Sequence, residues 1–183
     1  FAARENMEIA ELKNLFEGAR ERLFAVRERR IHPLKDDKIL TSWNGLMIAA
    51  MAKAYQALGD QAYVDAAQDA AGFISNTLKK DGHRLFRRYR DGEVAYPGYL
   101  DDYSNFVWGL IELYEATFEA SYLEEAINLN QTMIDLFWDE TYGGFFYSGK
   151  ENEVLIKQSK EIYDGAIPSS NSVVALNLMR LGH

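Results

Sequence analysis

Three clusters of polar and aromatic side chains stand just before apolar stretches of this sequence. Their members are Asp36, Asp37, Lys38, Ser42, Trp43 and Asn44; Tyr99, Asp101, Asp102, Tyr103 and Asn105; and Tyr163, Asp164, Ser169, Ser170 and Asn171. Carboxylates and amides form hydrogen bonds with sugar hydroxyls, and aromatic rings stack on the apolar faces of sugars. The composition of the clusters therefore predicts a carbohydrate site.

Carboxylates in the clusters could also supply acid and base chemistry, which needs two separated groups. We predict Asp101, Asp102 and Asp164 as the candidate catalytic residues. Other members of the clusters are predicted to bind the substrate, namely Asp37, Trp43, Asn44, Tyr103, Ser169, Ser170 and Asn171.

A structural role is the alternative for several of these residues. Asp and Ser side chains that precede a helix commonly accept hydrogen bonds from its first N–H groups. Asp102, Ser42 and Ser169 are all placed to act as such caps. For Trp43 and Trp108 a place in the hydrophobic core is favoured over a role as a sugar platform. The direction in which the carboxylates point, toward a cavity or toward helix ends, would separate the two interpretations.

The apolar stretches predict pairs of helices. Residues 43–58, after a turn at 42–45, are apolar on nearly every side, which predicts an inner helix with Leu46, Ala50 and Ala54 almost fully buried. Residues 61–79 carry a single apolar stripe, as in an outer helix. The same order returns at 102–118, where Leu110 and Leu113 should be buried, and at 121–138.

Short alternating runs around Asp91 and Gly92 predict a β-hairpin after the first helix pair, and residues 143–147 with 154–156 predict a second one. Five apolar or aromatic residues recur 59 positions later: Tyr55, Ala57, Tyr63, Ala67 and Phe86 return as Tyr114, Ala116, Tyr122, Ala126 and Phe145. This repeat predicts an array of helical hairpins whose parallel inner helices bring the three clusters to one end.

The two ends of the chain predict an open array. Residues 4–30 have the pattern of one long amphipathic helix that ends before Pro33, and residues 173–181 begin a third inner helix close to the last residue. We therefore expect residues 1–183 to be a single excised fragment of one domain. Its uncovered apolar flanks predict a homodimer whose interface involves Leu12, Phe16, Leu176 or Leu178.

Composition excludes several classes of function. The net charge of −8 lacks the basic surface that nucleic acid or an anionic membrane would need. The absence of cysteine rules out disulfides and thiolate metal sites, and no metal-ligand spacing or phosphate-binding loop is present. We therefore expect no metal, cofactor, nucleic-acid or membrane partner. The first residues do not form a signal peptide, so a cytoplasmic location is expected.

Three segments, 33–47, 99–103 and 164–172, resemble the thioredoxin-domain-containing family of bacterial YyaL-type proteins and animal spermatogenesis-associated homologues. The resemblance implies an all-α fold, part of an (α/α)6 toroid similar to N-acylglucosamine 2-epimerases and six-hairpin glycosidases. It also implies a thioredoxin-like partner domain in the full-length protein. This chain has no Cys-x-x-Cys motif, so it carries no thioredoxin chemistry itself.

Two functions follow from the clusters and the resemblance. The first is a toroid that binds or transforms a sugar in a central cavity. The second is a non-catalytic scaffold that docks the thioredoxin-like domain. The epimerases use histidines on inner helices, whereas the predicted inner helices here contain none before His183, which argues against epimerase activity.

Overall fold

The computed structural model of the protein describes residues 7–80, 83–153 and 156–182. The chain divides into two compact units, residues 1–37 and 38–183, and each is described by itself. In its described residues, 7–37, the first unit contains one helix, α1 (Ile9–Glu28), as the amphipathic pattern predicts. Phe16 on α1 and Leu176 in the second unit are exposed. The homodimer through these surfaces stays a prediction, as does the single fragment 1–183.

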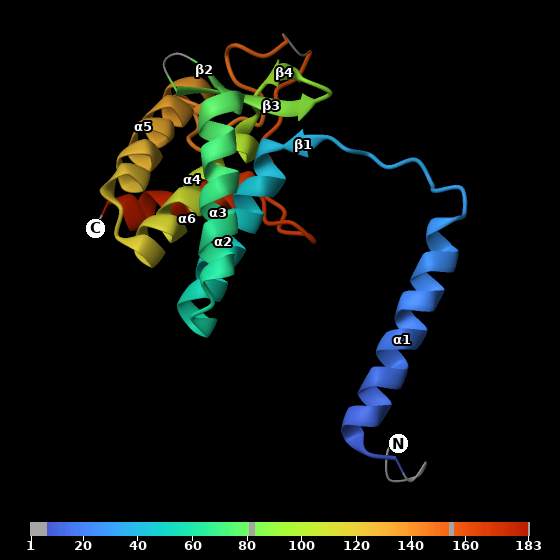
Figure 1. The fold of residues 1–183 in the computed structure, drawn as a ribbon. Helices are drawn as coiled ribbons and strands as arrows, with labels where there is room; N and C mark the ends of the chain where they lie inside the picture. The colour runs from blue at the N-terminus through green and yellow to red at the C-terminus, as the bar shows by residue number, and fades with distance from the viewer. Residues whose placement is uncertain (1–6, 81–82, 154–155, 183) are drawn as a thin grey trace. The chain divides into compact units, whose positions relative to one another are not determined.

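The second unit is built of helical hairpins (Figure 1). Helix α2 (Thr41–Leu58) is followed by α3 (Gln61–Phe73), which ends in one π-helical turn, η1 (Ile74–Leu78). Helix α4 (Leu100–Thr117) is followed by α5 (Ala120–Phe137), and α6 (Ser170–Leu181) is the third inner helix. In the described ranges no helix is both long and apolar enough to cross a membrane.

A small antiparallel sheet lies at the ends where α2 and α4 begin. Its central strand, β3 (Arg84–Arg90), pairs with β1 (Ile39–Leu40), β2 (Lys79–Lys80) and β4 (Glu93–Pro97). The β3–β4 hairpin turns at Asp91 and Gly92, so the first predicted β-hairpin is confirmed. Strands β1 and β2 were not predicted. Because β1 runs directly into α2, its pairing with β3 fixes the start of α2 beside the hairpin.

The second predicted β-hairpin is wrong in the described residues, where Trp138 and Phe145 form an isolated bridge in place of a ladder. Val154 and Leu155, which the prediction also used, lie outside the described residues. The physical reason is the side chain of Asn171. Its amide accepts from the Phe145 N–H at 2.9 Å and donates to the Phe145 carbonyl at 3.0 Å. This side chain therefore satisfies the backbone groups that a strand would have satisfied.

The helix enclosed on every side is α4, whereas α2 has one open face. Leu110 and Leu113 of α4 are fully buried, as predicted. The prediction for α2 is wrong, because Leu46 and Ala54 are half-buried and Ala50 is exposed. The reason is that α4 has more neighbouring helices than α2. Helix α4 packs against α2, α5 and α6, but α2 packs within unit 38–183 mainly against α3 and α4.

Two glycines allow α2 and α4 to touch backbone to backbone. The predicted turn at 42–45 is instead the first turn of α2, and Gly45 faces α4. A Cβ atom on Gly45 would lie 2.5 Å from the carbonyl carbon of Asn105, and one on Gly109 would lie 2.9 Å from the Gly45 oxygen. No side chain larger than hydrogen fits at either position without a shift of the backbone, so the two helices are in direct backbone contact there.

A buried carboxylate of α4 joins all three inner helices. Glu112 of α4 lies 2.9 Å from Lys53 Nζ of α2 and 2.7 Å from Arg180 Nη1 of α6, and it accepts from Trp108 Nε1 at 2.9 Å. Burial raises the pKa of Glu112, but the bonds from Lys53, Arg180 and Trp108 lower it by a larger amount, so the net shift is downward. Glu112 is therefore held as a carboxylate between two cations.

We expect Gly45→Ala to destabilise the fold by at least about 2 kcal/mol, because the new methyl group meets backbone atoms that cannot rotate away. Urea unfolding followed by circular dichroism measures the change. Gly72→Ala in α3 is the matched control, since a Cβ there meets nothing within 4 Å. That substitution should be neutral or stabilising by up to about 1 kcal/mol. Equal stability of the two variants would contradict the close contact.

Leu110→Ala should cost roughly 2–5 kcal/mol of unfolding free energy, because it leaves a cavity at a site with no solvent contact. Leu58→Ala, at an exposed position near the end of α2, removes the same atoms and should change stability by less than about 0.5 kcal/mol. A loss below about 1 kcal/mol for Leu110→Ala in denaturant melts would show that α4 is not the enclosed helix.

Candidate functional site

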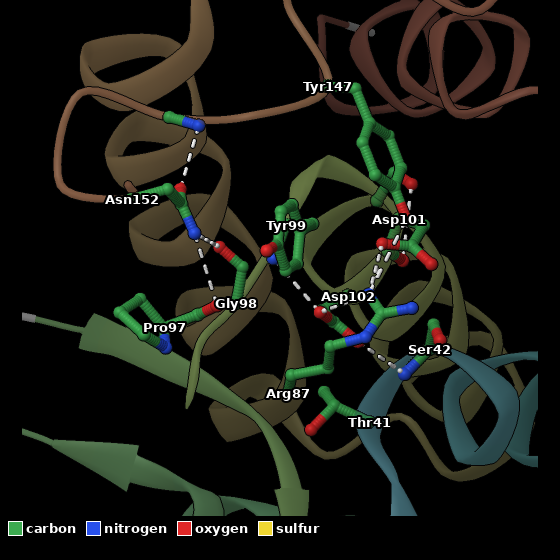
Figure 2. A network of polar contacts seen from close by, with 12 residues as sticks. Thr41, Ser42, Arg87, Pro97, Gly98, Tyr99, Asp101, Asp102, Tyr147 and Asn152 are labelled. Atoms are coloured by element: carbon green, nitrogen blue, oxygen red, sulfur yellow. Dashed lines mark hydrogen bonds and ion pairs between the residues drawn. The ribbon is translucent and has the colours of Figure 1, made fainter. Parts of the chain in front are cut away.

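Ser42 of the first polar cluster meets the second cluster where α2 and α4 begin (Figure 2). Asp102 lies in the first turn of α4, where Oδ2 accepts from the Tyr99 N–H at 2.9 Å. Its other oxygen, Oδ1, accepts from the Ser42 N–H of α2 at 3.0 Å. Leu40, the N-cap of α2, has no side-chain oxygen to offer. One carboxylate therefore caps two helices, and the predicted capping role of Asp102 is what the geometry shows.

Arg87 of β3 brings the sheet into contact with this carboxylate. Its Nη1 lies 3.2 Å from Asp101 Oδ1 and 3.3 Å from Asp102 Oδ2. The guanidinium also lies over the Tyr99 ring, with Cζ 4.9 Å from the ring centroid. Tyr99 stacks on Tyr147 at 5.2 Å between centroids. We call Arg87, Tyr99, Asp101, Asp102 and Tyr147 the Arg87 cluster.

A hollow of about 420 Å3 opens beside the Arg87 cluster. Its wall is made of aromatic rings, hydroxyls and one guanidinium, from Arg87, Tyr96, Tyr99, Tyr147, Ser148 and Ser159. This mixture of flat apolar faces and hydrogen-bonding groups is typical of a small-molecule site.

The two neighbouring carboxylates of the cluster differ in access. The Asp102 side chain is fully buried and its oxygens are used by Ser42, Tyr99 and Arg87. The Asp101 side chain keeps 23% of its surface exposed and has Arg87 as its partner. A ligand can therefore touch Asp101 but not Asp102. Asp102 acts as a positioning residue for Arg87 and for both helix ends.

The electrostatics of the cluster follow from burial. Burial and the adjacent Asp101 carboxylate raise the pKa of Asp102 to about 7, although Tyr99, Arg87 and Ser42 favour its charged form. Burial lowers the pKa of Arg87, but Asp102 and Asp101 raise it more, so Arg87 stays charged. Burial and Asp101 also raise the pKa of the Tyr147 hydroxyl. Tyr147 therefore remains a hydrogen-bond donor near neutral pH.

The third cluster is built around the start of α6. Asp164 Oδ1 accepts from the Ser169 N–H at 2.8 Å, and Oδ2 accepts from the Ser172 hydroxyl at 3.1 Å. Ser169 is the N-cap of α6, and its Oγ accepts from the Ser172 N–H. These bonds lower the pKa of Asp164, with Ser169 as the largest cause. The contacts of this predicted catalytic residue thus lie within its own loop and helix.

The other predicted binding residues have varied places. Tyr103 is buried, with its hydroxyl accepting from the Leu85 N–H at 2.9 Å, and Asn44 donates to the Leu40 carbonyl. Ser170 is buried at the start of α6. Trp43, by contrast, is 62% exposed on the first turn of α2.

Asp37 closes the unit 1–37, which is not placed relative to the cluster. The bonds of Asn171 go to backbone groups of Phe145 and Glu161. The ligand roles of all the predicted site residues stay predictions.

Sequence reasoning missed Arg87 and Tyr147 as members of the site. Both precede an inner helix by way of a connecting segment, residues 84–97 for α4 and residues 138–169 for α6. Since each connection must return the chain to the end where inner helices begin, its polar residues arrive near the clusters. The sequence repeat could have predicted that these connections lie near the clusters. It could not have predicted the pairing of β1 with β3, which fixes Arg87.

Comparison with known proteins identifies the fold to which this site belongs. The profile of glycosyl hydrolase family 9 matches residues 12–174. The chain belongs to glycosyl hydrolase family 9. Spermatogenesis-associated protein 20 of Homo sapiens is 37% identical over 98% of this chain and 24% of that protein, which confirms the predicted resemblance to that family. This family 9 chain thus spans about a quarter of the length of that relative.

Solved structures share the fold of this chain. A sugar epimerase from a ruminal bacterium superposes with a TM-score of 0.65 at 18% identity, covering 82% of this chain and 40% of that one. A family 105 glycoside hydrolase of C. acetobutylicum superposes with a TM-score of 0.62 at 15% identity, covering 94% and 56%. The predicted all-α fold, part of an (α/α)6 toroid, is therefore confirmed.

The raised pKa of Asp102 predicts a pH-dependent stability. The folded state holds a proton on Asp102 up to about pH 7, whereas the unfolded chain loses it near pH 4. Between these values Asp102 should lower the unfolding free energy by up to about 1.4 kcal/mol per pH unit as pH rises. Urea melts from pH 4 to pH 8 would reveal this contribution.

Asp102→Asn serves as the reference, because its amide has one acceptor oxygen for the two N–H groups at every pH and no proton to release. Its stability should therefore fall less steeply with pH than that of the wild type. Asp101→Asn should move the Asp102 transition to lower pH, since the repelling charge is gone. Parallel curves for wild type and Asp102→Asn would contradict the prediction.

Proposed function

We propose that the Arg87 cluster binds a carbohydrate, with Asp101 as the carboxylate that contacts the sugar hydroxyls. The observation that carries the proposal is the partly exposed Asp101, whose partner Arg87 lines a hollow of about 420 Å3 together with the stacked rings of Tyr99 and Tyr147. The fold supports it, because the solved structures that it resembles include a sugar epimerase and a glycoside hydrolase.

Each group of the cluster has a distinct part in this proposal. Asp101 accepts hydrogen bonds from sugar hydroxyls, and the N–H groups of Arg87 donate to sugar oxygens. Tyr147 stays protonated and donates as well, while the tyrosine rings offer apolar faces to the sugar. Trp43, exposed on α2 one residue after the Ser42 that bonds to Asp102, is a further platform in this proposal.

A transformation of the sugar, epimerisation or hydrolysis, would place the proton transfer on Asp101. Asp102 cannot take that part, because its side chain has no exposed surface. Most glycosidases use two carboxylates that both reach the substrate. In the described part of the Arg87 cluster Asp101 alone is accessible, so sugar binding is the part of the proposal that this chain supports best.

Isothermal titration of the protein with neutral mono- and disaccharides tests the proposal. Asp101→Asn should weaken binding about 10- to 100-fold, the range for one hydrogen bond to a charged group. The melting temperature should stay close to that of the wild type, because Asp102 and not Asp101 caps the helices. Asp69→Asn removes an equal charge from the exposed face of α3 and should leave binding unchanged.

The absence of any binding heat with the wild type across the sugar panel would refute a carbohydrate site here. Equal affinities for wild type and Asp101→Asn would refute the part given to Asp101. A loss of binding in Asp69→Asn that matches the loss in Asp101→Asn would show a general effect of charge.

A docking domain for a thioredoxin-like partner is the second candidate function. It is favoured by the hydrogen bonds that Asp102 and Asp164 accept at the starts of α2, α4 and α6, because these bonds give both carboxylates a structural role. Titration with the thioredoxin-like domain of a full-length relative separates the candidates. Binding of that domain without any response to sugars would support docking and contradict the carbohydrate site.

A further inference from the structure

Tyr96 is an unusual residue at the edge of the hollow beside the Arg87 cluster. The pairs Phe86 with Pro97 and Arg88 with Ala95 flank it in the β3–β4 ladder, so Tyr96 lies opposite Arg87. It lines the same hollow as Arg87, Tyr99 and Tyr147, yet 59% of its surface is exposed. The guanidinium of Arg88 lies over its ring, with Cζ 5.2 Å from the centroid.

The backbone of Tyr96 is in the left-handed region, with φ of 62°. A residue with a Cβ atom is disfavoured there, and a large aromatic residue more so than Asn or Gly. The exposed ring gains little burial in return. A strained backbone that keeps an exposed aromatic ring at a ligand-sized hollow points to a functional use of that ring.

The charges around the hollow indicate an uncharged ligand. The guanidinium of Arg87 already has Asp101 and Asp102 as partners, and Arg88 has Glu93 at 3.8 Å. The other groups in the wall are tyrosine and serine side chains. An acidic sugar would meet no unpaired cation in this wall and would lie near the Asp101 carboxylate. A neutral sugar has no charge to be desolvated without a partner and none to be repelled by Asp101.

We infer that Tyr96 is a second sugar subsite, so that the hollow takes a neutral oligosaccharide with one unit at Asp101 and the next unit stacked on Tyr96. This inference rests on the proposed carbohydrate function and deepens it. Tyr99, Tyr147 and Asp101 hold the first unit, while the Arg88 guanidinium lies over one face of the Tyr96 ring. Arg88 thereby leaves one face of the ring for the ligand.

Titration of the protein with glucose and cellobiose, with mannose and mannobiose, and with digalacturonate tests the inference. At least one neutral disaccharide should bind the wild type at least 10-fold more tightly than its own monosaccharide and than digalacturonate. Tyr96→Asn should reduce that advantage to threefold or less and leave monosaccharide affinity unchanged. Because Asn accepts the left-handed backbone, this variant should melt at the wild-type temperature or above.

Tyr142→Asn is the matched control, since it removes another exposed tyrosine from outside the hollow and should keep the disaccharide advantage. Monosaccharide binding without any gain for a disaccharide would overturn the Tyr96 subsite and leave the carbohydrate function standing. Tighter binding of digalacturonate than of the neutral sugars would overturn the inferred ligand class. Failure of the wild type to bind any of these sugars would overturn the proposed function and this inference together.

Discussion

The backbone contact between α2 and α4 is the constraint on which the site depends. Gly45 and Gly109 leave no room for a side chain between the helices, so the first turns of α2 and α4 lie within hydrogen-bond distance. Only at that separation can the Asp102 carboxylate reach Ser42 as well as Tyr99. The position of Asp102 then fixes Arg87, and Arg87 in turn meets Asp101 and the two stacked tyrosines. The geometry of the Arg87 cluster thus depends on the absence of side chains at Gly45 and Gly109.

Two buried carboxylates show how the same fold keeps one acid charged and lets another take up a proton. Glu112 lies between Lys53 and Arg180, and its pKa is lowered. Asp102 has one cation, Arg87, and must share it with Asp101, so burial and repulsion raise its pKa to about 7. Burial raises the pKa of both carboxylates, but two cations and Trp108 outweigh it at Glu112, whereas the single shared cation does not outweigh it at Asp102. The charge of Asp102, at the end where α2 and α4 begin, therefore changes with pH near neutrality.

Periodicity in the sequence was enough to predict the helical hairpins, because burial on one or on all sides leaves a direct pattern of apolar residues. It could not tell that α4 is enclosed while α2 has an open face, since Leu46 and Leu110 stand in equally apolar stretches and differ in their neighbours. The capping alternative for Asp102 came from its place before a helix. Arg87 was out of reach, because a two-residue strand, Ile39–Leu40, determines what Arg87 meets. Contacts between distant segments decide the site, and a single sequence does not record them.

The shared cap at Asp102 also bears on how the array folds. In a simple solenoid each repeat has its own stability and gains more by stacking on a neighbour. Here the first turn of α2 takes its cap from a residue 60 positions away, in the next repeat. The hairpin of α2 and α3 alone would leave the Ser42 N–H without that acceptor and its buried stripe open to water. Folding of the first repeat is therefore coupled to folding of the second, so these two hairpins should open and close as one cooperative unit.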